Sequence, residues 1–159
     1  MNLSNKIIIL DNTLSEAECS KIINVFNVAR NGNLASVYRD TLLFEVVENT
    51  SLYKMALTVQ RSVSFLTNKI GIDWCHIVEW PAGSKQNFHI DDTSGDTVFT
   101  SITYLNDDYA GGETQFLNDI SVVPKRGRTV YFDGNYYTHG VNEITSGTRY
   151  TLPIWYKSI

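Results

Sequence analysis

The chain has 159 residues, of which 43% are hydrophobic, 12% aromatic and 19% charged. This length and apolar content fit one domain of ordinary size with its own core, and they exclude two full domains and a disordered tail. The 13 basic and 17 acidic residues give a formal net charge of −4. Because the chain lacks a strongly basic balance, we expect no nucleic-acid partner.

The cysteines and the N-terminal residues indicate a cellular compartment. Cys19 and Cys75 lie far apart and match neither a zinc-binding pair nor a disulfide framework, so we expect two buried, reduced thiols. The apolar run at 7–10 ends at Asp11 and is too short for a signal-peptide core or a membrane span. We therefore expect a cytoplasmic protein without a membrane partner.

The first part of the chain is predicted to be largely helical. A short strand at 7–10 precedes a helix that begins at Ser15, where Ser15 and Glu18 have the spacing of a capping box. That helix is expected to end at 31–33, before a strand at 41–47. A second helix is predicted over 51–69, because apolar residues recur there at steps of three and four, and Gly71 is expected to form its left-handed cap.

From residue 73 onward the pattern changes to short strands separated by turn signals. Strands at such close spacing favour a jelly roll. We therefore predict a single, mainly β domain over 1–159, with helical support at about 11–71 and a jelly-roll core at about 73–157. The predicted strands are 74–80, 86–90, 97–105, 113–117, 120–123, 128–132, 137–144 and 148–156.

Two of the three histidines suggest a metal site. His89 and Asp91 are two residues apart, so on a strand they point to the same side with Cα atoms roughly 6.6 Å apart. His139 is the best candidate for a third ligand from a neighbouring strand. Two histidines and one carboxylate form the facial triad of non-haem Fe(II) oxygenases. A hydrogen-bonded surface pair is the alternative for His89 and Asp91, and His76 is expected to be structural.

Arg149 lies ten residues after His139 on a predicted strand. Alternation along that strand places Arg149, Thr151 and Trp155 on one face and an apolar set on the other. An enclosed arginine needs an anionic partner, because an unpaired buried charge is costly. A carboxylate ligand is one such partner, and Asp133, Glu143 or bulk water are the alternatives.

The stretch from Trp80 to Trp155 resembles the Fe(II)/2-oxoglutarate-dependent dioxygenases, most closely their prolyl 4-hydroxylase-like branch. The opening segment at 10–19 is similar to the family's usual opening as well. The resemblance implies a double-stranded β-helix, a jelly roll braced by N-terminal α-helices. The segments that carry the resemblance, in chain order, are 80–83 with 89–91, 104–107 with 111–116, 124–127 with 130–132, and 139–141 with 147–155.

The resemblance also implies roles for individual residues. It assigns His89, Asp91 and His139 to iron and Arg149 to the far carboxylate of 2-oxoglutarate, where prolyl 4-hydroxylases usually carry lysine. Related hydroxylases often carry, nine residues before the first iron histidine, a tyrosine whose hydroxyl reaches the cosubstrate, and here that position is a tryptophan. The remaining candidates for cosubstrate contacts are Thr114, Thr151 and Trp80.

By this resemblance the protein is a dioxygenase that uses Fe(II), 2-oxoglutarate and O2, with ascorbate as a candidate reductant, and that releases succinate and CO2. The implied substrate is a prolyl residue in a peptide or protein. We expect Trp155 to form a wall of the pocket, Tyr104 to line its mouth, and Arg39 to belong to a lid at 31–40. The alternatives are hydroxylation of a free amino acid or another small molecule, a cupin-like metalloenzyme without 2-oxoglutarate, and a jelly-roll binding module.

Overall fold

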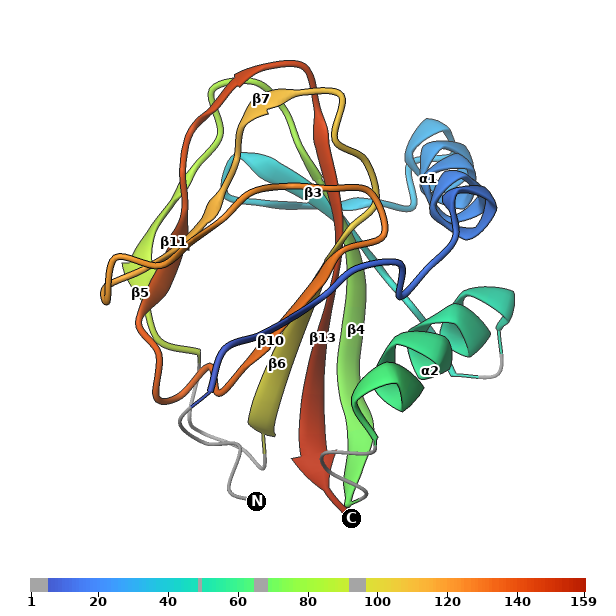
Figure 1. Ribbon diagram of the computed structural model, residues 1–159. Helices are drawn as coiled ribbons and strands as arrows, with labels where there is room; N and C mark the ends of the chain where they lie inside the picture. Colours follow the sequence, from blue (N-terminus) through green and yellow to red (C-terminus); the bar gives the residue numbers. More distant parts are fainter. Residues whose placement is uncertain (1–5, 49, 65–68, 92–96) are drawn as a thin grey trace.

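The computed structural model describes residues 6–48, 50–64, 69–91 and 97–159. Two helices and a β-hairpin precede the strands of the core (Figure 1). The N-terminal elements are β1 (Ile8–Leu10), α1 (Glu16–Asn31), β2 (Ser36–Tyr38), β3 (Thr41–Glu45) and α2 (Ser51–Val63). The core strands are β4 (Ile70–Trp80), β5 (Gln86–His89), β6 (Thr97–Tyr104), β7 (Ala110–Gly111), β8 (Thr114–Phe116), β9 (Ser121–Val122), β10 (Thr129–Phe132), β11 (His139–Val141), β12 (Ile144–Ser146) and β13 (Arg149–Ser158).

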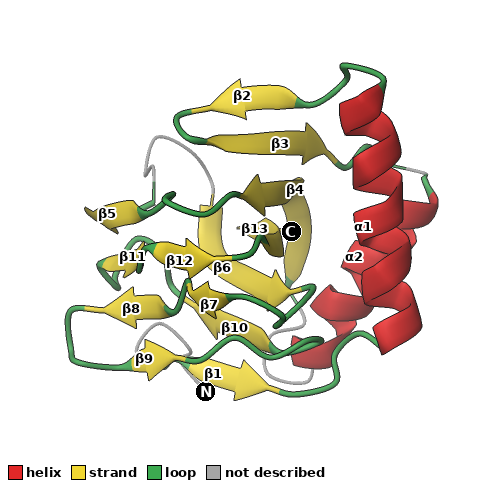
Figure 2. Ribbon diagram, turned by 90° about the horizontal axis from the view of Figure 1, so that it is seen from above, coloured by secondary structure: helices red, strands yellow, loops and turns green. Residues whose placement is uncertain are grey.

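The strands form a large sheet and a small sheet that face each other. The large sheet has seven strands in the order β1-β10-β6-β13-β4-β3-β2, and the small one has four in the order β5-β11-β8-β9. Strands β7 and β12 form a further pair. Both helices cover the outer face of the large sheet, as Figure 2 shows. The mainly β fold with bracing helices agrees with the prediction.

Helix α1 begins where the sequence predicts. The Ser15 hydroxyl accepts a hydrogen bond from the Glu18 backbone N–H at 3.1 Å, and the Glu18 carboxylate accepts one from the Ser15 N–H at 3.0 Å. This capping box satisfies two backbone donors that the first turn leaves free. The helix ends at Asn31, as expected.

Helix α2 is shorter than predicted. It ends at Val63, whereas the apolar spacing predicts a helix to residue 69, and positions 65–68 lie outside the described residues. Ile70 and Gly71 instead belong to β4, where they pair with Ser158 and Lys157 of β13. The left-handed cap predicted at Gly71 is therefore wrong, because strand pairing governs this segment.

The strand predictions hold for all eight core segments, although several strands are shorter than expected. The largest difference is at 137–144, where His139–Val141 forms β11 and Ile144 already begins β12. Strand β2 was expected to be part of a lid loop. Its residues pair with β3 at the edge of the large sheet, so this part of the predicted lid is a regular element of the sheet.

Two apolar clusters hold these layers together. Between the helices and the large sheet, Phe26 of α1 and Val59 of α2 are fully buried in the same cluster as Ile77 of β4 and Ile154 of β13. A smaller cluster fills the space between the sheets and includes Phe116 and several residues of the large sheet. Because β13 alternates, one of its faces packs on the helices and the other faces the small sheet.

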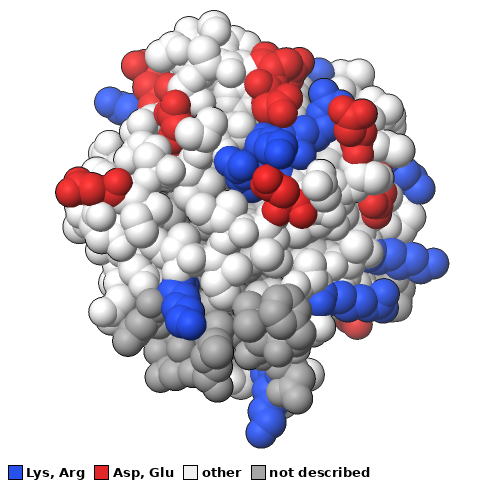
Figure 3. All heavy atoms as spheres, viewed as in Figure 1, with Lys and Arg blue, Asp and Glu red and all other residues white. Residues whose placement is uncertain are grey.

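The surface carries charges of both signs, which lie beside one another in Figure 3. Asp11 accepts hydrogen bonds from Lys125 at 3.2 Å and from Arg128 at 2.7 Å. Hydrogen bonds from these two cations lower the pKa of Asp11 to about 2. The basic turn before β10 is thus neutralised locally.

No helix among the described ranges has the length and apolar character that crossing a membrane requires. Both cysteines are buried and unpaired, as predicted.

We expect Ile77→Ala to lower the free energy of unfolding by about 2–5 kcal/mol, because it leaves a cavity between the helices and the large sheet. Urea denaturation measures this change. The control is Ile9→Ala, at a position that is 45% exposed, where we expect less than about 1 kcal/mol. Equal losses for the two variants would contradict the proposed packing of the helices.

Candidate metal and cosubstrate site

The predicted triad converges on one point between the two sheets. His89 ends β5 and His139 begins β11, and the two residues are direct partners in the small sheet. The Nε2 atom of His139 lies 3.4 Å from Asp91 Oδ1, and that of His89 lies 3.8 Å from the same oxygen. The three ligand atoms, one from each residue, all lie within 4.8 Å of one another, which suits a single bound cation.

Both imidazoles are oriented by the backbone. His89 Nδ1 donates to the carbonyl oxygen of Asn87 at 2.9 Å, and His139 Nδ1 donates to that of Tyr137 at 2.8 Å. Since a carbonyl only accepts, each ring carries its proton on Nδ1 when neutral. This tautomer leaves both Nε2 lone pairs directed at the common point, which is the arrangement that metal-binding histidines use.

The carboxylate of Asp91 is held by the large sheet. Its Oδ2 accepts hydrogen bonds from Thr100 at 2.6 Å and from the indole of Trp155 at 3.2 Å. These bonds leave Oδ1 facing the two imidazoles. Gly134 is also required here, because a Cβ at that position would lie 2.0 Å from Asp91 Oδ2. Strands β6 and β13 therefore hold the carboxylate by hydrogen bonds, and the turn after β10 leaves the space that it occupies.

The ionisation states suit metal binding. Burial lowers the pKa of His89, which keeps its imidazole neutral near pH 7. Burial would raise the pKa of Asp91, but the adjacent imidazole of His139, the hydrogen bond from Thr100 and the nearby His89 outweigh this effect, so the pKa of this carboxyl lies below its usual value. Two neutral imidazoles and one carboxylate are the ligand forms that Fe(II) takes.

Arg149 lies in the interior with an exposed fraction of 1%. Its Nε and Nη2 have no hydrogen-bond partner in the described part of the chain. The guanidinium carbon lies 4.9 Å from the ring centre of Trp80 and 5.4 Å from that of Tyr104. Aromatic faces stabilise a cation but do not satisfy its N–H groups. These orphaned donors fit a carboxylate ligand.

The alternative partners of Arg149 are not used. The Asp133 carboxylate instead accepts hydrogen bonds from the backbone N–H groups of Asn135 and Tyr136. Neither Asp133 nor Glu143 forms an ion pair with Arg149 among the described residues. Because Arg149 is only 1% exposed, bulk water is excluded as its partner as well.

The other predicted cosubstrate residues lie around Arg149. The Thr114 hydroxyl is 2.5 Å from the hydroxyl of Tyr104, and the Thr151 hydroxyl accepts a hydrogen bond from the Trp80 indole at 3.3 Å. Thr114 and Thr151 are both buried. The triad and this polar group therefore occupy the same space between the sheets.

Two of the predicted substrate residues, Tyr104 and Arg39, differ in how deeply they are buried. Tyr104 is fully buried, so it lies beside Arg149 and not at the mouth of the pocket, because alternation along β6 directs it inward with Thr100. Arg39 is exposed in the turn between β2 and β3, and its charge contributes to lowering the pKa of His89. Arg39 therefore stays a candidate on the solvent side of the triad.

Three residues of the site were missed by sequence reasoning. Thr100 and Gly134 support Asp91 from distant parts of the chain, and no spacing signal links them to it. Tyr109 is the third, since its hydroxyl is buried without a partner near Arg149. Its place two residues before the Gly111–Gly112 pair was the available signal, because paired glycines permit close approach of side chains.

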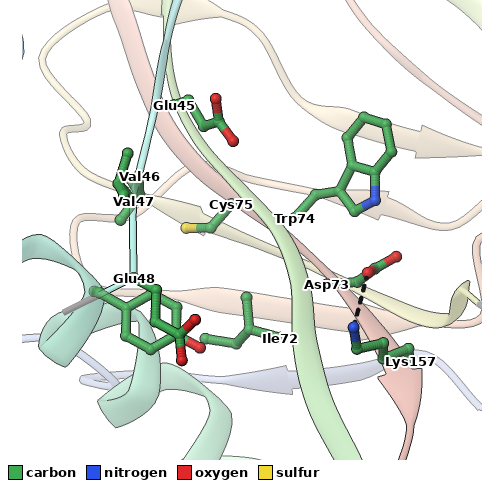
Figure 4. Close-up of a pocket in the computed structure, with 10 residues that line it drawn as sticks. Glu45, Val46, Val47, Glu48, Ile72, Asp73, Trp74, Cys75 and Lys157 are labelled. Atoms are coloured by element: carbon green, nitrogen blue, oxygen red, sulfur yellow. Dashed lines mark ion pairs between the residues drawn. The ribbon is translucent and has the colours of Figure 1, made fainter. Parts of the chain in front are cut away.

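A separate cavity of about 410 Å³ lies at the edge of β4 beyond the end of β3 (Figure 4). Trp74 and Glu45 line it, together with an ion pair of 3.4 Å between Lys157 and Asp73. Trp74 is 60% exposed and is the direct strand partner of Trp155. Because direct partners share a face, Trp74 lies on the face of the large sheet that carries Trp155, whose ring contacts the imidazole of His76 at a centroid distance of 5.5 Å.

A comparison with protein families identifies the class. Residues 75–157, just over half of the chain, match the model of the 2OG-Fe(II) oxygenase superfamily. The chain therefore belongs to this superfamily, whose members use Fe(II) and 2-oxoglutarate. The donor set of the triad and the orphaned guanidinium of Arg149 fit both groups.

Particular relatives are prolyl hydroxylases. A segment of 65 residues is 34% identical to prolyl 3-hydroxylase 2 of Homo sapiens, and it covers 36% of this chain and only 9% of that protein. A viral collagen prolyl hydroxylase from Paramecium Bursaria Chlorella virus-1, in complex with 2-oxoglutarate, has a TM-score of 0.80 at 18% identity, with 99% of this chain and 98% of that chain covered.

A second similar structure is a prolyl hydroxylase from Trichoplax adhaerens in complex with a peptide fragment of hypoxia inducible factor. Its TM-score is 0.78 at 21% identity, with 98% of this chain and 84% of that chain covered. These similarities establish the double-stranded β-helix that the sequence predicts.

We expect Gly134→Ala to weaken metal binding by about 10- to 100-fold, because the added methyl group displaces the Asp91 carboxylate from its position. Calorimetric titration with Mn(II) measures the affinity. The matched control is Gly32→Ala, where the added Cβ meets its nearest atom at an ordinary 3.5 Å. Unchanged affinity in Gly134→Ala would show that Asp91 is not held as described.

Proposed function

We propose that the protein hydroxylates a prolyl residue in a peptide or protein and uses O2 with its Fe(II) and 2-oxoglutarate. One observation carries the cosubstrate part of this proposal, namely the buried guanidinium of Arg149, whose Nε and Nη2 have no hydrogen-bond partner among the described residues. A triad alone suits several kinds of metalloenzyme, including cupin-like ones. A nearby buried cation that needs an anion favours a diacid, which binds the metal at one end and arginine at the other.

His89, Asp91 and His139 would hold Fe(II), and Arg149 would hold the distal carboxylate of 2-oxoglutarate. Bound together, the two groups would supply the oxidation in which O2, 2-oxoglutarate and a substrate C–H bond yield C–OH, succinate and CO2, with one oxygen atom of O2 in succinate and the other in the product. Thr114 and Thr151 offer hydroxyl groups along the same interior wall. The surrounding aromatic rings exclude water from this space.

The solvent side of the site supports an extended substrate. The side chain of His89 is 31% exposed, whereas those of Asp91 and His139 are 9% and 5% exposed, so a substrate approaches from the His89 side. From there Trp155 and Trp74 offer aromatic surfaces on the same face of paired strands. Aromatic grooves are the surfaces that bind proline-rich segments, since the rigid, apolar pyrrolidine packs on them at low entropic cost.

The similar structures support the same substrate class, because one is a collagen prolyl hydroxylase and the other contains a peptide fragment. We test the substrate by incubating Fe(II)-loaded protein with 2-oxoglutarate, ascorbate and a library of proline-containing peptides. The expected result is a mass gain of one oxygen atom on proline, with stoichiometric succinate. Oxygen gain on a free amino acid but on no peptide would overturn the peptide assignment.

We expect Arg149→Gln to weaken 2-oxoglutarate binding on the order of 100-fold, because a charge-assisted pair with the distal carboxylate is lost. Binding of oxalate, which chelates a metal but has no distal carboxylate, is expected to stay unchanged. Calorimetry on Mn(II)-loaded protein measures both affinities. Equal 2-oxoglutarate affinity in the variant and the parent would exclude the assigned role of Arg149.

We expect Trp74→Ala to raise the KM for a proline-containing peptide by about 10-fold, since it removes aromatic contact area beyond the triad. The KM for 2-oxoglutarate should not change. The control is Trp155→Phe, which keeps an aromatic wall but removes the indole N–H that Asp91 accepts. We expect this control to alter the metal affinity. An unchanged peptide KM in Trp74→Ala would argue against contact between the peptide and Trp74.

A further inference from the structure

We propose that the hydroxyl of Tyr109 is a second donor to the distal carboxylate of 2-oxoglutarate, beside Arg149. This inference rests on the proposed function, because it assumes that the distal carboxylate lies at Arg149. Sequence reasoning did not assign a role to Tyr109.

Tyr109 and Arg149 come together over Gly112. A Cβ at Gly112 would lie 2.9 Å from Arg149 Cδ and also 2.9 Å from Tyr109 Cε2. Gly112 has a φ of +72°, in the left-handed region that favours glycine. The absence of a side chain at this position therefore allows the phenol ring, from the loop before β7, and the arginine stem, from β13, to approach each other.

Three polar atoms in this place have no partner within the described residues. They are Nε and Nη2 of Arg149 and the hydroxyl oxygen of Tyr109, and all three are inaccessible to water. A buried donor without a partner destabilises the protein, and a charged one does so more strongly. Such a concentration of unsatisfied donors marks a binding position for an acceptor-rich group.

The other tyrosine hydroxyls of the interior are satisfied, which sets Tyr109 apart. Each of them finds a hydroxyl, a carboxylate or a backbone carbonyl. The pairs are Tyr104 with Thr114, Tyr131 with Ser62 and the carbonyl of Val59, Tyr150 with Glu79, and Tyr156 with Ser101.

The chemistry of the missing partner follows from the donors. A guanidinium requires an anion, and a phenol that is protonated donates one hydrogen bond. Burial raises the pKa of Tyr109, and the charge of Arg149 offsets only part of this effect, so the phenol keeps its proton. A carboxylate has two oxygen atoms with several lone pairs and can accept from both side chains at once.

The test is 2-oxoglutarate binding to the full chain loaded with Mn(II), measured by calorimetry. We expect Tyr109→Phe to weaken 2-oxoglutarate binding by about 10-fold or more, since a hydrogen bond to a charged group is lost. Oxalate binding should stay unchanged, because oxalate lacks the distal carboxylate. The matched control is Tyr53→Phe on α2, which removes a phenol hydroxyl from the opposite side of the large sheet. Equal 2-oxoglutarate affinity in Tyr109→Phe and the parent would overturn the proposal.

A second background separates a direct donor from a residue that acts only through Arg149. In Arg149→Lys, the carboxylate keeps a cationic partner but the guanidinium is gone. A direct donor predicts that Tyr109→Phe still weakens 2-oxoglutarate binding in this background, and loss of the effect there would overturn the direct contact. If Arg149→Gln itself leaves the affinity unchanged, the proposed placement of the cosubstrate fails, and this outcome is distinct from failure of Tyr109 alone.

Discussion

The carboxylate of Asp91 joins the two sheets, and the geometry of the site depends on that connection. Asp91 follows β5 of the small sheet, yet its Oδ2 accepts hydrogen bonds from Thr100 on β6 and Trp155 on β13 of the large sheet. Because Oδ2 is committed to these donors, Oδ1 is left to face the imidazoles of His89 and His139. The distance between the sheets thus fixes the relative positions of the three side chains of the candidate metal site.

Strand β13 connects the core to the chemistry through its alternation. Its inward set packs with both helices around Ile154, and its opposite set carries Arg149 and Trp155 into the space between the sheets. A register shift of one residue would exchange these sets, burying the guanidinium among aliphatic side chains. The apolar pattern that stabilises the helices therefore also determines that Arg149 faces the triad.

Local patterns made much of this architecture predictable, whereas contacts between distant segments were not. The capping box at Ser15 and the two-residue spacing of His89 and Asp91 are local signals, and each gave the correct geometry. The end of α2 was mispredicted because apolar spacing continues to Ile70, which pairs with Ser158 from the far end of the chain. Tyr104 was predicted at the mouth because its depth depends on the second sheet, which local spacing does not contain.

Trp80 shows how one departure from a family pattern changes its surroundings. Related hydroxylases often place a tyrosine hydroxyl here, but the Trp80 indole donates to Thr151 and its ring lies 4.9 Å from the guanidinium carbon of Arg149. The ring face stabilises the cation without offering an O–H group. A tyrosine hydroxyl at this end of the pocket must then come from another part of the chain. Tyr109 has a hydroxyl without a partner among the described residues, and its ring lies beside the stem of Arg149 over Gly112.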